Sequence, residues 1–240
     1  MIPKIIHYCW FGKGAMPELV QNCITSWRTY MPDWKYQLWS EDNFDVSTAP
    51  QYVQEAYAAK KYAFVSDYVR LWALEQEGGV YLDTDVEILR PLDTLLSDTA
   101  FIGLEESKAL LPGTCVMGCE AHSLWVKDML ATYENATFLK EDGSLDLTTN
   151  VQRLGAKMVE GGLLHERKIQ YLSQWGLRVY THDYFSPITS TRVMRKSKNT
   201  YCIHRFVGSW VDGKKSRLRD WWISRELINI LVQIKRIIKR

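Results

Sequence analysis

A short apolar segment that leads directly into two carboxylates constrains this chain most. Val80, Tyr81 and Leu82 form the apolar segment, and Asp83 and Asp85 follow it. In an extended strand, side chains two residues apart point to the same side, so the pattern predicts two carboxylates presented together at a strand end. A hard divalent cation binds such oxygen ligands and keeps open positions for substrate phosphates. The alternative is a pair of solvated aspartates in a turn.

The segment before this strand has the pattern of an amphipathic helix over residues 63–77. Gly78-Gly79 ends it, because glycine adopts the left-handed conformation of a helix C-cap without steric penalty. Asp67 and Arg70 are three residues apart and therefore neighbours on the helix surface. With no further role they would form a surface ion pair, which contributes well under about 1 kcal/mol. The apolar stripe of this helix consists of Phe64, Tyr68, Leu71 and Leu74.

Three blocks of the chain form a recognisable set. The central block contains Ser-Asp-x-x-Arg, Gly-Gly-x-Tyr-x-Asp-x-Asp and Arg-Pro-Leu-Asp, and residues 2–12 and 204–210 flank it. Together they resemble glycosyltransferase family 32: its opening strand, its sugar-binding region with the Asp-x-Asp motif, and its C-terminal His…Ser-Trp element. The resemblance spans about residues 2–211. This family includes capsular-polysaccharide and lipooligosaccharide transferases, yeast mannosyltransferase relatives and, more distantly, clostridial glucosylating toxins.

The resemblance implies a GT-A fold and assigns roles to five residues. Asp85 would be a direct ligand of Mn²⁺ or Mg²⁺, and Asp83 would contact the metal and the hydroxyls of the ribose or sugar. Arg70 and Asp67 would reach the donor sugar. Trp10 would stack on the nucleobase of the nucleotide sugar; its alternative is a core tryptophan.

Residues near the C-terminal block also receive assignments. A neutral His204 imidazole would complete the metal site and favour Mn²⁺, although a lone histidine is more often structural. Ser209 and Trp210 would lie on a loop that closes over the diphosphate and excludes water. Lys214 and Lys215 would add phosphate contacts.

The resemblance also implies a retaining transfer of a hexose, from a UDP-hexose or from GDP-mannose, to a glycan or glycolipid acceptor in surface polysaccharide biosynthesis. No general base stands out, which fits a front-face mechanism in which a donor phosphate oxygen takes the acceptor proton. Glu105 and Glu106 are candidate acceptor-side carboxylates, and Asn150 and Gln152 are candidate ligands for acceptor hydroxyls; an exposed polar loop would explain all four equally well.

The 240 residues suit one α/β catalytic domain, placed at residues 1–213, followed by a basic tail at 214–240. Strands that alternate with helices predict a mainly parallel sheet flanked by helices. The five cysteines are scattered; Cys115 and Cys119 form a zinc half-site without a partner pair, so we expect reduced thiols. Strands are expected at 4–8, 35–39, 80–82, 100–104, 114–118, 169–172, 178–180 and 201–204, and helices at 17–30, 63–77, 123–133 and 149–160.

The tail concentrates positive charge. Residues 214–240 carry a net charge of +7, which leaves −5 on residues 1–213, so a uniformly basic nucleic-acid binder is not indicated. Apolar residues at helical spacing from about Arg219 to Lys239 predict an amphipathic helix, either docked on the core or lying on an anionic membrane. With no signal peptide or membrane-spanning run, we expect a cytoplasmic protein with peripheral attachment to the inner face of the membrane. The oligomeric state is open.

Two other classes compete with a glycosyltransferase. The segment Val80–Val86 also fits the opening motif of haloacid-dehalogenase-type phosphatases, with Asp83 as nucleophile and Asp85 as acid and base. That scheme needs a later acidic pair, which we do not find, and it leaves Ser-Asp-x-x-Arg unexplained. The second alternative is a non-catalytic protein that binds sugar nucleotides, although both aspartates and Arg70 are present.

Overall fold

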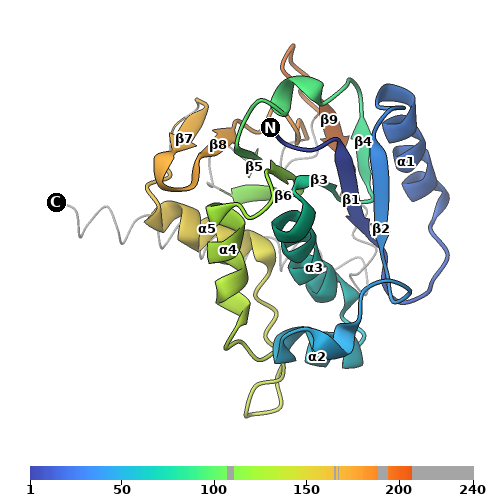
Figure 1. The fold of residues 1–240 in the computed structure, drawn as a ribbon, viewed down its shortest axis with the longest axis vertical. Helices are drawn as coiled ribbons and strands as arrows, with labels where there is room; N and C mark the ends of the chain where they lie inside the picture. The colour runs from blue at the N-terminus through green and yellow to red at the C-terminus, as the bar shows by residue number, and fades with distance from the viewer. Residues whose placement is uncertain (107–110, 165, 167, 189–193, 207–240) are drawn as a thin grey trace.

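The computed structural model describes residues 1–106, 111–164, 166, 168–188 and 194–206. Within these residues a seven-stranded sheet runs in the order β2-β1-β3-β6-β5-β8-β7, and helices pack on it (Figure 1). Its strands are β1 (Ile5–Cys9), β2 (Lys35–Trp39), β3 (Gly79–Leu82), β5 (Ala100–Glu106), β6 (Leu111–Cys119), β7 (Gln170–Leu172) and β8 (Leu177–Tyr180). The predicted α/β fold, a sheet flanked by helices, is confirmed; the predicted C-terminal helix lies outside the described residues.

The sheet contains both strand directions. β1 pairs in parallel with β2 and β3, and β5 pairs in parallel with β8. β6 is antiparallel to both of its neighbours, β3 and β5, and β7 is antiparallel to β8. The predicted alternation of strands and helices is confirmed for β1, β2 and β3, but only four residues separate β5 from β6, and these two strands pair antiparallel.

Helices cover one face of the sheet and a second layer covers the other. Helices α2, α3, α4 and α5 pack on the first face, and α1 and a small extra sheet pack on the second (Figure 1). The strand β3 shows this directly, because Tyr81 packs in the first core whereas Val80 and Leu82 pack in the second. A continuous apolar run therefore marks a strand buried on both faces.

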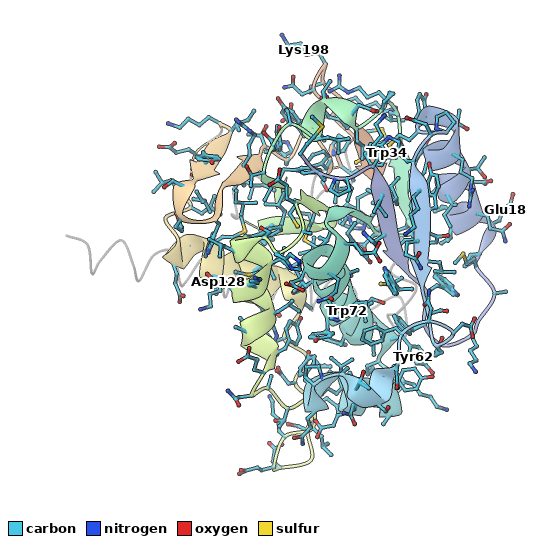
Figure 2. The ribbon with its side chains drawn as sticks, viewed as in Figure 1. Glu18, Trp34, Tyr62, Trp72, Asp128 and Lys198 are labelled. Atoms are coloured by element: carbon cyan, nitrogen blue, oxygen red, sulfur yellow. The ribbon has the colours of Figure 1, made fainter. Side chains whose placement is uncertain are left out.

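The helices lie close to their predicted positions. The α-helices are α1 (Glu18–Tyr30), α2 (Gln51–Ala58), α3 (Tyr62–Glu77), α4 (Leu124–Leu130) and α5 (Asn150–Glu160). Short 3₁₀ turns lie at η1 (Val46–Thr48), η2 (Asp93–Leu95), η3 (Ala131–Tyr133) and η4 (Ser173–Trp175). Trp72 of α3 packs edge-on against Trp39 at the end of β2, with ring centroids 5.1 Å apart. Figure 2 labels Trp72 among the side chains between α3 and the sheet.

Gly78 ends α3 at the predicted position, but not in the predicted left-handed conformation. Its backbone has φ 63° and ψ −164°, a region open essentially to glycine alone, and its N–H donates to Leu74 O at 3.0 Å. A Cβ at this position would lie 2.5 Å from the backbone nitrogen of Ala121. The turn from α3 into β3 therefore requires glycine both for its dihedral angles and for the close approach of another segment.

A second sheet of two strands was not predicted as such. β4 (Val86–Ile88) pairs antiparallel with β9 (Cys202–His204), with Val86 opposite His204. The sequence predicts β9 but not β4, because three residues are too few to show a period of two. This pairing matters for function, since it joins the segment after Asp85 to the end of the described chain.

His7 on β1 is fully buried and bonded through both ring nitrogens. Nε2 lies 2.8 Å from the carbonyl oxygen of Gly78, and the indole N–H of Trp39 donates to Nδ1 at 3.1 Å. Nδ1 accepts and Nε2 donates, so the ring is neutral. Burial lowers the pKa of His7 below its ordinary value of 6.5.

We predict that His7 makes folding stability depend on pH below 6.5. There the unfolded chain binds a proton at this ring that the folded chain does not bind, so the free energy of unfolding falls as the pH drops. Between pH 7.5 and 5.5, urea unfolding of the His7→Gln variant should lose less stability than the parent protein. The difference is at most about 1.4 kcal/mol per pH unit. Equal slopes in the two proteins would contradict the prediction.

Candidate metal and donor site

The Asp83–Asp85 segment is a turn and not the end of an extended strand. Asp83 N–H still donates to Cys115 O of β6 at 2.9 Å, which continues the ladder of β3 by one residue. Val86 N–H then donates to Asp83 O at 3.0 Å, which closes a turn before β4 begins. The predicted extended geometry is therefore wrong, yet the turn still brings the two carboxylates together.

His204 joins the two aspartates through the β4–β9 pairing. One ligand atom from each of Asp83, Asp85 and His204 lies within 4.8 Å of the other two. The His204 Nε2 atom lies 3.3 Å from Asp85 Oδ1, and both side chains are largely buried. Two carboxylate oxygens and one imidazole nitrogen on a shared centre form a donor set that suits Mn²⁺. The structure thus places His204 where the family resemblance needs it.

Glu105 lies behind His204. Its Oε1 atom is 3.5 Å from His204 Nδ1, a buried nitrogen without a hydrogen-bond partner among the described residues. Burial alone would lower the pKa of His204, but contacts with Cys115 and Asp85 raise that pKa well above its ordinary value. Glu105 occupies the place of the carboxylate that orients metal-binding histidines through their second nitrogen. The structure therefore places Glu105 beside His204, whereas the sequence suggested that Glu105 lies on the acceptor side of the site.

Arg70 is buried beside the same aspartates. Its guanidinium Nη1 lies 3.3 Å from Asp83 Oδ1, and its Nη2 lies 3.1 Å from Asp67 Oδ1. Nη1 also donates to the Thr114 carbonyl at 2.9 Å, and the guanidinium lies 4.5 Å from the centre of the Tyr81 ring. Only 7% of the Arg70 side chain is exposed, so the alternative of a solvated surface ion pair is wrong.

Asp67 connects this pair to α5. Its Oδ2 accepts a hydrogen bond from the backbone N–H of Asn150, and its carbonyl accepts one from the Asn150 amide, both at 2.9 Å. Asn150 also accepts from the Tyr133 hydroxyl, and the Gln152 side chain caps the helix at Thr149. Asn150 and Gln152 therefore hold the start of α5, which differs from their predicted contact with acceptor hydroxyls. Burial raises the pKa of Asp67, against the neighbouring Arg70.

Sequence reasoning missed two groups of the site. The Tyr81 hydroxyl donates to Asp83 Oδ1 at 2.9 Å. Tyr81 precedes Asp83 by two residues, and the ladder of β3 continues to Asp83, so the strand period of two was the signal for this contact. The Thr114 carbonyl, which accepts from Arg70, comes from β6 and had no local signal in the sequence.

Trp10 lies at the same edge of the sheet as the aspartates. β1 and β3 are parallel with His7 opposite Tyr81, so this register continues with Cys9 level with Asp83. Trp10 follows Cys9, is partly buried, and donates its indole N–H to Gly14 O at 2.6 Å. This placement suits a nucleobase platform, and that role stays a prediction. Ser209, Trp210, Lys214 and Lys215 lie outside the described residues.

The cysteines do not build a second metal site among the described residues. All five are buried free thiols, including Cys115 and Cys119 on β6. In the part of the chain that the structure describes, Asp83, Asp85 and His204 are the group of three ligand-type side chains close enough to share an ion. None of its helices is long and apolar enough to cross a membrane.

Comparison with known families supports the interpretation of this site. Residues 17–102 match the family described as glycosyltransferase sugar-binding region containing DXD motif. This match covers α1 to β5 and includes Asp67, Arg70, Asp83 and Asp85, whereas residues 2–12 and 204–210 fall outside it. The predicted resemblance to a family-32-like glycosyltransferase is thus confirmed, with the match centred on the Asp-x-Asp region.

Two curated relatives match part of this chain. The chain is 32% identical over 111 residues to inositol phosphoceramide mannosyltransferase 1 of Schizosaccharomyces pombe, which covers 42% of this chain and 33% of the relative. It is 36% identical over 142 residues to glucan organizing enzyme 1 of Cryptococcus neoformans, which covers 55% of this chain and 34% of that protein. The chain thus spans about a third of the length of these relatives.

Solved structures show weaker similarity. One titled PaToxG Glycosyltransferase has a TM-score of 0.49 at 17% identity and covers 67% of this chain and 72% of its own. A glycosyltransferase involved in glycosylation of the major capsid of PBCV-1 has a TM-score of 0.42 at 14% identity, over 91% of this chain and 98% of its own. We draw no functional conclusion from similarity at this level.

We predict that Asp85 is required for metal binding. Replacing a group that only orients a ligand usually costs about 10- to 100-fold in metal affinity. Asp85→Asn removes the negative charge and one carboxylate oxygen of a direct ligand, so it should weaken Mn²⁺ binding by at least about 100-fold. Titration followed by electron paramagnetic resonance would measure it. The matched control is Glu87→Gln, because Glu87 lies two residues away and pairs with Arg205 instead. Equal affinity in the two variants would remove Asp85 from the site.

Proposed function

We infer that this protein, which carries the sugar-binding region of a DXD-type glycosyltransferase, moves a hexose from a nucleotide sugar to a glycan or glycolipid acceptor. The observation that carries the proposal is the meeting of Asp83, Asp85 and His204 beside the buried Arg70–Asp67 pair. In a phosphatase mechanism the Arg70–Asp67 pair would have no role. A non-catalytic protein with a degenerate site would not need to keep this pair next to the three ligand-type side chains.

Asp85 and His204 are the side chains best placed to hold a divalent cation. Asp83 already uses its Oδ1 atom for Arg70 and Tyr81, which leaves Oδ2 for the shared centre. Glu105 stands behind His204 to orient the ring. A bound Mn²⁺ or Mg²⁺ stabilises the negative charge that develops on a diphosphate leaving group.

Arg70 orients the Asp67 and Asp83 carboxylates and, as the family resemblance implies, contacts the donor sugar. Its planar fork holds Asp67 on one side and Asp83 on the other, while the Thr114 carbonyl fixes the same nitrogen that faces Asp83. A side chain fixed at this many points keeps its geometry when the donor binds, and such preorganisation is what a charge-stabilising site requires.

We propose a donor and an acceptor from the names of the relatives. Two matched proteins are named mannosyltransferases that act on inositol phosphoceramide. GDP-mannose is therefore the first donor to test, next to the UDP-hexoses that the family resemblance implies, and a glycolipid is the first acceptor. The family resemblance suggests that the reaction belongs to the biosynthesis of a surface polysaccharide, such as a capsule or lipooligosaccharide.

We predict donor binding that depends on metal and on Trp10. A thermal-shift screen with Mn²⁺ should show that GDP-mannose or a UDP-hexose raises the melting temperature, because a ligand that binds only the folded state stabilises it. Trp10→Ala should weaken calorimetric binding of the matching nucleotide by about 5- to 150-fold, since base stacking contributes about 1–3 kcal/mol. Tyr30→Ala, an exposed aromatic change on α1, is the control.

Three outcomes would count against the proposal, one from this calorimetry and two from assays of nucleotide release and phosphate release. Unchanged nucleotide affinity in Trp10→Ala would return Trp10 to a packing role. Release of nucleotide from the donor at full rate in EDTA would remove the metal from the reaction. Release of phosphate from simple phosphate esters, with no effect of any nucleotide sugar, would favour the phosphatase alternative.

We also predict that residues 219–240 attach the protein to anionic membranes. They lie outside the described residues, and the prediction rests on their basic and apolar spacing. Each Lys or Arg close to such a surface contributes about 1 kcal/mol, an attraction that salt screens. In low salt the full chain should float with anionic vesicles and a 1–218 truncation should not. Flotation of both, or of neither, would contradict this.

A further inference from the structure

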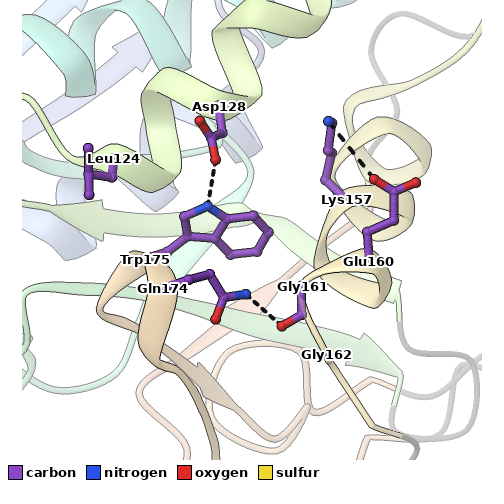
Figure 3. A pocket seen from close by; sticks show the side chains of 8 residues that line it. All are labelled: Leu124, Asp128, Lys157, Glu160, Gly161, Gly162, Gln174 and Trp175. Atoms are coloured by element: carbon purple, nitrogen blue, oxygen red, sulfur yellow. Dashed lines mark hydrogen bonds and ion pairs between the residues drawn. The ribbon is translucent and has the colours of Figure 1, made fainter.

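An open hollow lies away from the metal and donor site. It has a volume of about 580 Å³ and is lined by α4, the C-terminal end of α5 and the 3₁₀ turn η4 (Figure 3). This volume falls within the range of about 300–1,000 Å³ that is usual for small-molecule sites. Its lining consists of Leu124, Asp128, Lys157, Glu160, Gly161, Gly162, Gln174 and Trp175.

The indole of Trp175 is held in one orientation in this hollow. Its N–H donates to Asp128 Oδ2 at 2.7 Å. The neighbouring Gln174 amide donates to the Gly161 carbonyl at 2.6 Å. Figure 3 shows the ring between Asp128 and Gly161. A Cβ on Gly161 would lie 2.6 Å from the Trp175 ring, so only glycine lets α5 approach the indole this closely. The ring is therefore a fixed, partly exposed aromatic surface.

The polar groups around the ring favour a ligand rich in hydroxyl groups. Asp128 and Glu160 bring two carboxylates and Lys157 one ammonium, so the hollow has an excess of negative charge and disfavours phosphates and nucleotides. Lys157 and Glu160 are 3.9 Å apart and well exposed, so this weak pair can rearrange around a ligand. Carboxylates, an amide and an ammonium together accept and donate hydrogen bonds to hydroxyls.

We propose that this hollow is a second carbohydrate-binding site, which takes an uncharged oligosaccharide with one sugar ring against Trp175. The apolar face of a sugar ring covers the indole, while its hydroxyls bond to Asp128, Glu160 and Gln174. Aromatic side chains with a bonded polar edge suit such a half-apolar ligand. The open shape suits a chain that extends beyond the hollow.

The hollow is separate from the proposed reaction centre. α5 begins at Asn150, which bonds to Asp67, and ends at Glu160 in the lining of the hollow. At 1.5 Å per residue these 11 residues span about 16 Å. An acceptor glycan longer than a single sugar is the ligand that would profit from both places. That last step rests on the proposed function, whereas binding in the hollow does not.

The test observes binding without any turnover. Indole N–H resonances of the full chain are recorded during titration with mannotriose, maltotriose, cellotriose and chitotriose, without metal or nucleotide. The Trp175 resonance, assigned from its absence in Trp175→Phe, should shift with at least one trisaccharide. Glu160→Ala, on an exposed side chain, should weaken the affinity by at least threefold. Tyr171→Ala, an exposed aromatic on β7 outside the lining, should leave it unchanged.

Each result decides the matter. A shift of the Trp175 resonance that Glu160→Ala weakens and Tyr171→Ala preserves supports the site. No shift with any of the four sugars, or shifts confined to other tryptophans, overturns it. Failure here leaves donor binding and nucleotide release intact, so it is distinguishable from failure of the proposed function. If both hold, Trp175→Phe should raise KM for long acceptors while the rate of donor hydrolysis stays the same.

Discussion

The buried charge on Arg70 is the constraint around which the site is built. A guanidinium that is 7% exposed must be paired, because an unpaired charge in the interior costs several kcal/mol. Asp67, Asp83 and the Thr114 carbonyl meet that requirement from α3, the end of β3 and β6. Through Asp67 the same network reaches the start of α5. Helices from one face of the sheet and the turn at Asp83–Asp85 are thereby held in a single arrangement.

Such a network explains why the Asp83 carboxylate is held in one position. Breaking a buried pair by removal of one partner usually costs about 3–5 kcal/mol, which is a large part of the stability of a domain. The energy that stabilises the fold here also fixes Asp83 through its bonds to Arg70 and Tyr81. The same interactions therefore stabilise the fold and preorganise the proposed donor site.

The structure distributes polar recognition over two places joined by α5. Its first residue is bonded to the Arg70–Asp67 pair, and its last turn lines the hollow around Trp175. Both places carry more carboxylates than cations, but the donor site brings two carboxylates and an imidazole within reach of a single ion, whereas the hollow has no such group among the described residues. That difference separates a site suited to a metal and a diphosphate from one suited to hydroxyl groups.

The sequence by itself determined the local elements and the chemical identity of the site. The helix before Gly78, the glycine that ends it, the strand buried on both faces and the adjacent carboxylates all follow from periodicity and backbone sterics within about twenty residues. It also supplied the family resemblance that named His204. Tertiary structure decided the rest: the turn at Asp83–Asp85, the pairing of β4 with β9, the contact of Glu105 with His204, and the bond from Asn150 to Asp67, 83 residues away. These contacts join segments distant in the chain, and nothing in their local sequence specifies the partner, because it is the packing of the whole sheet that brings them together.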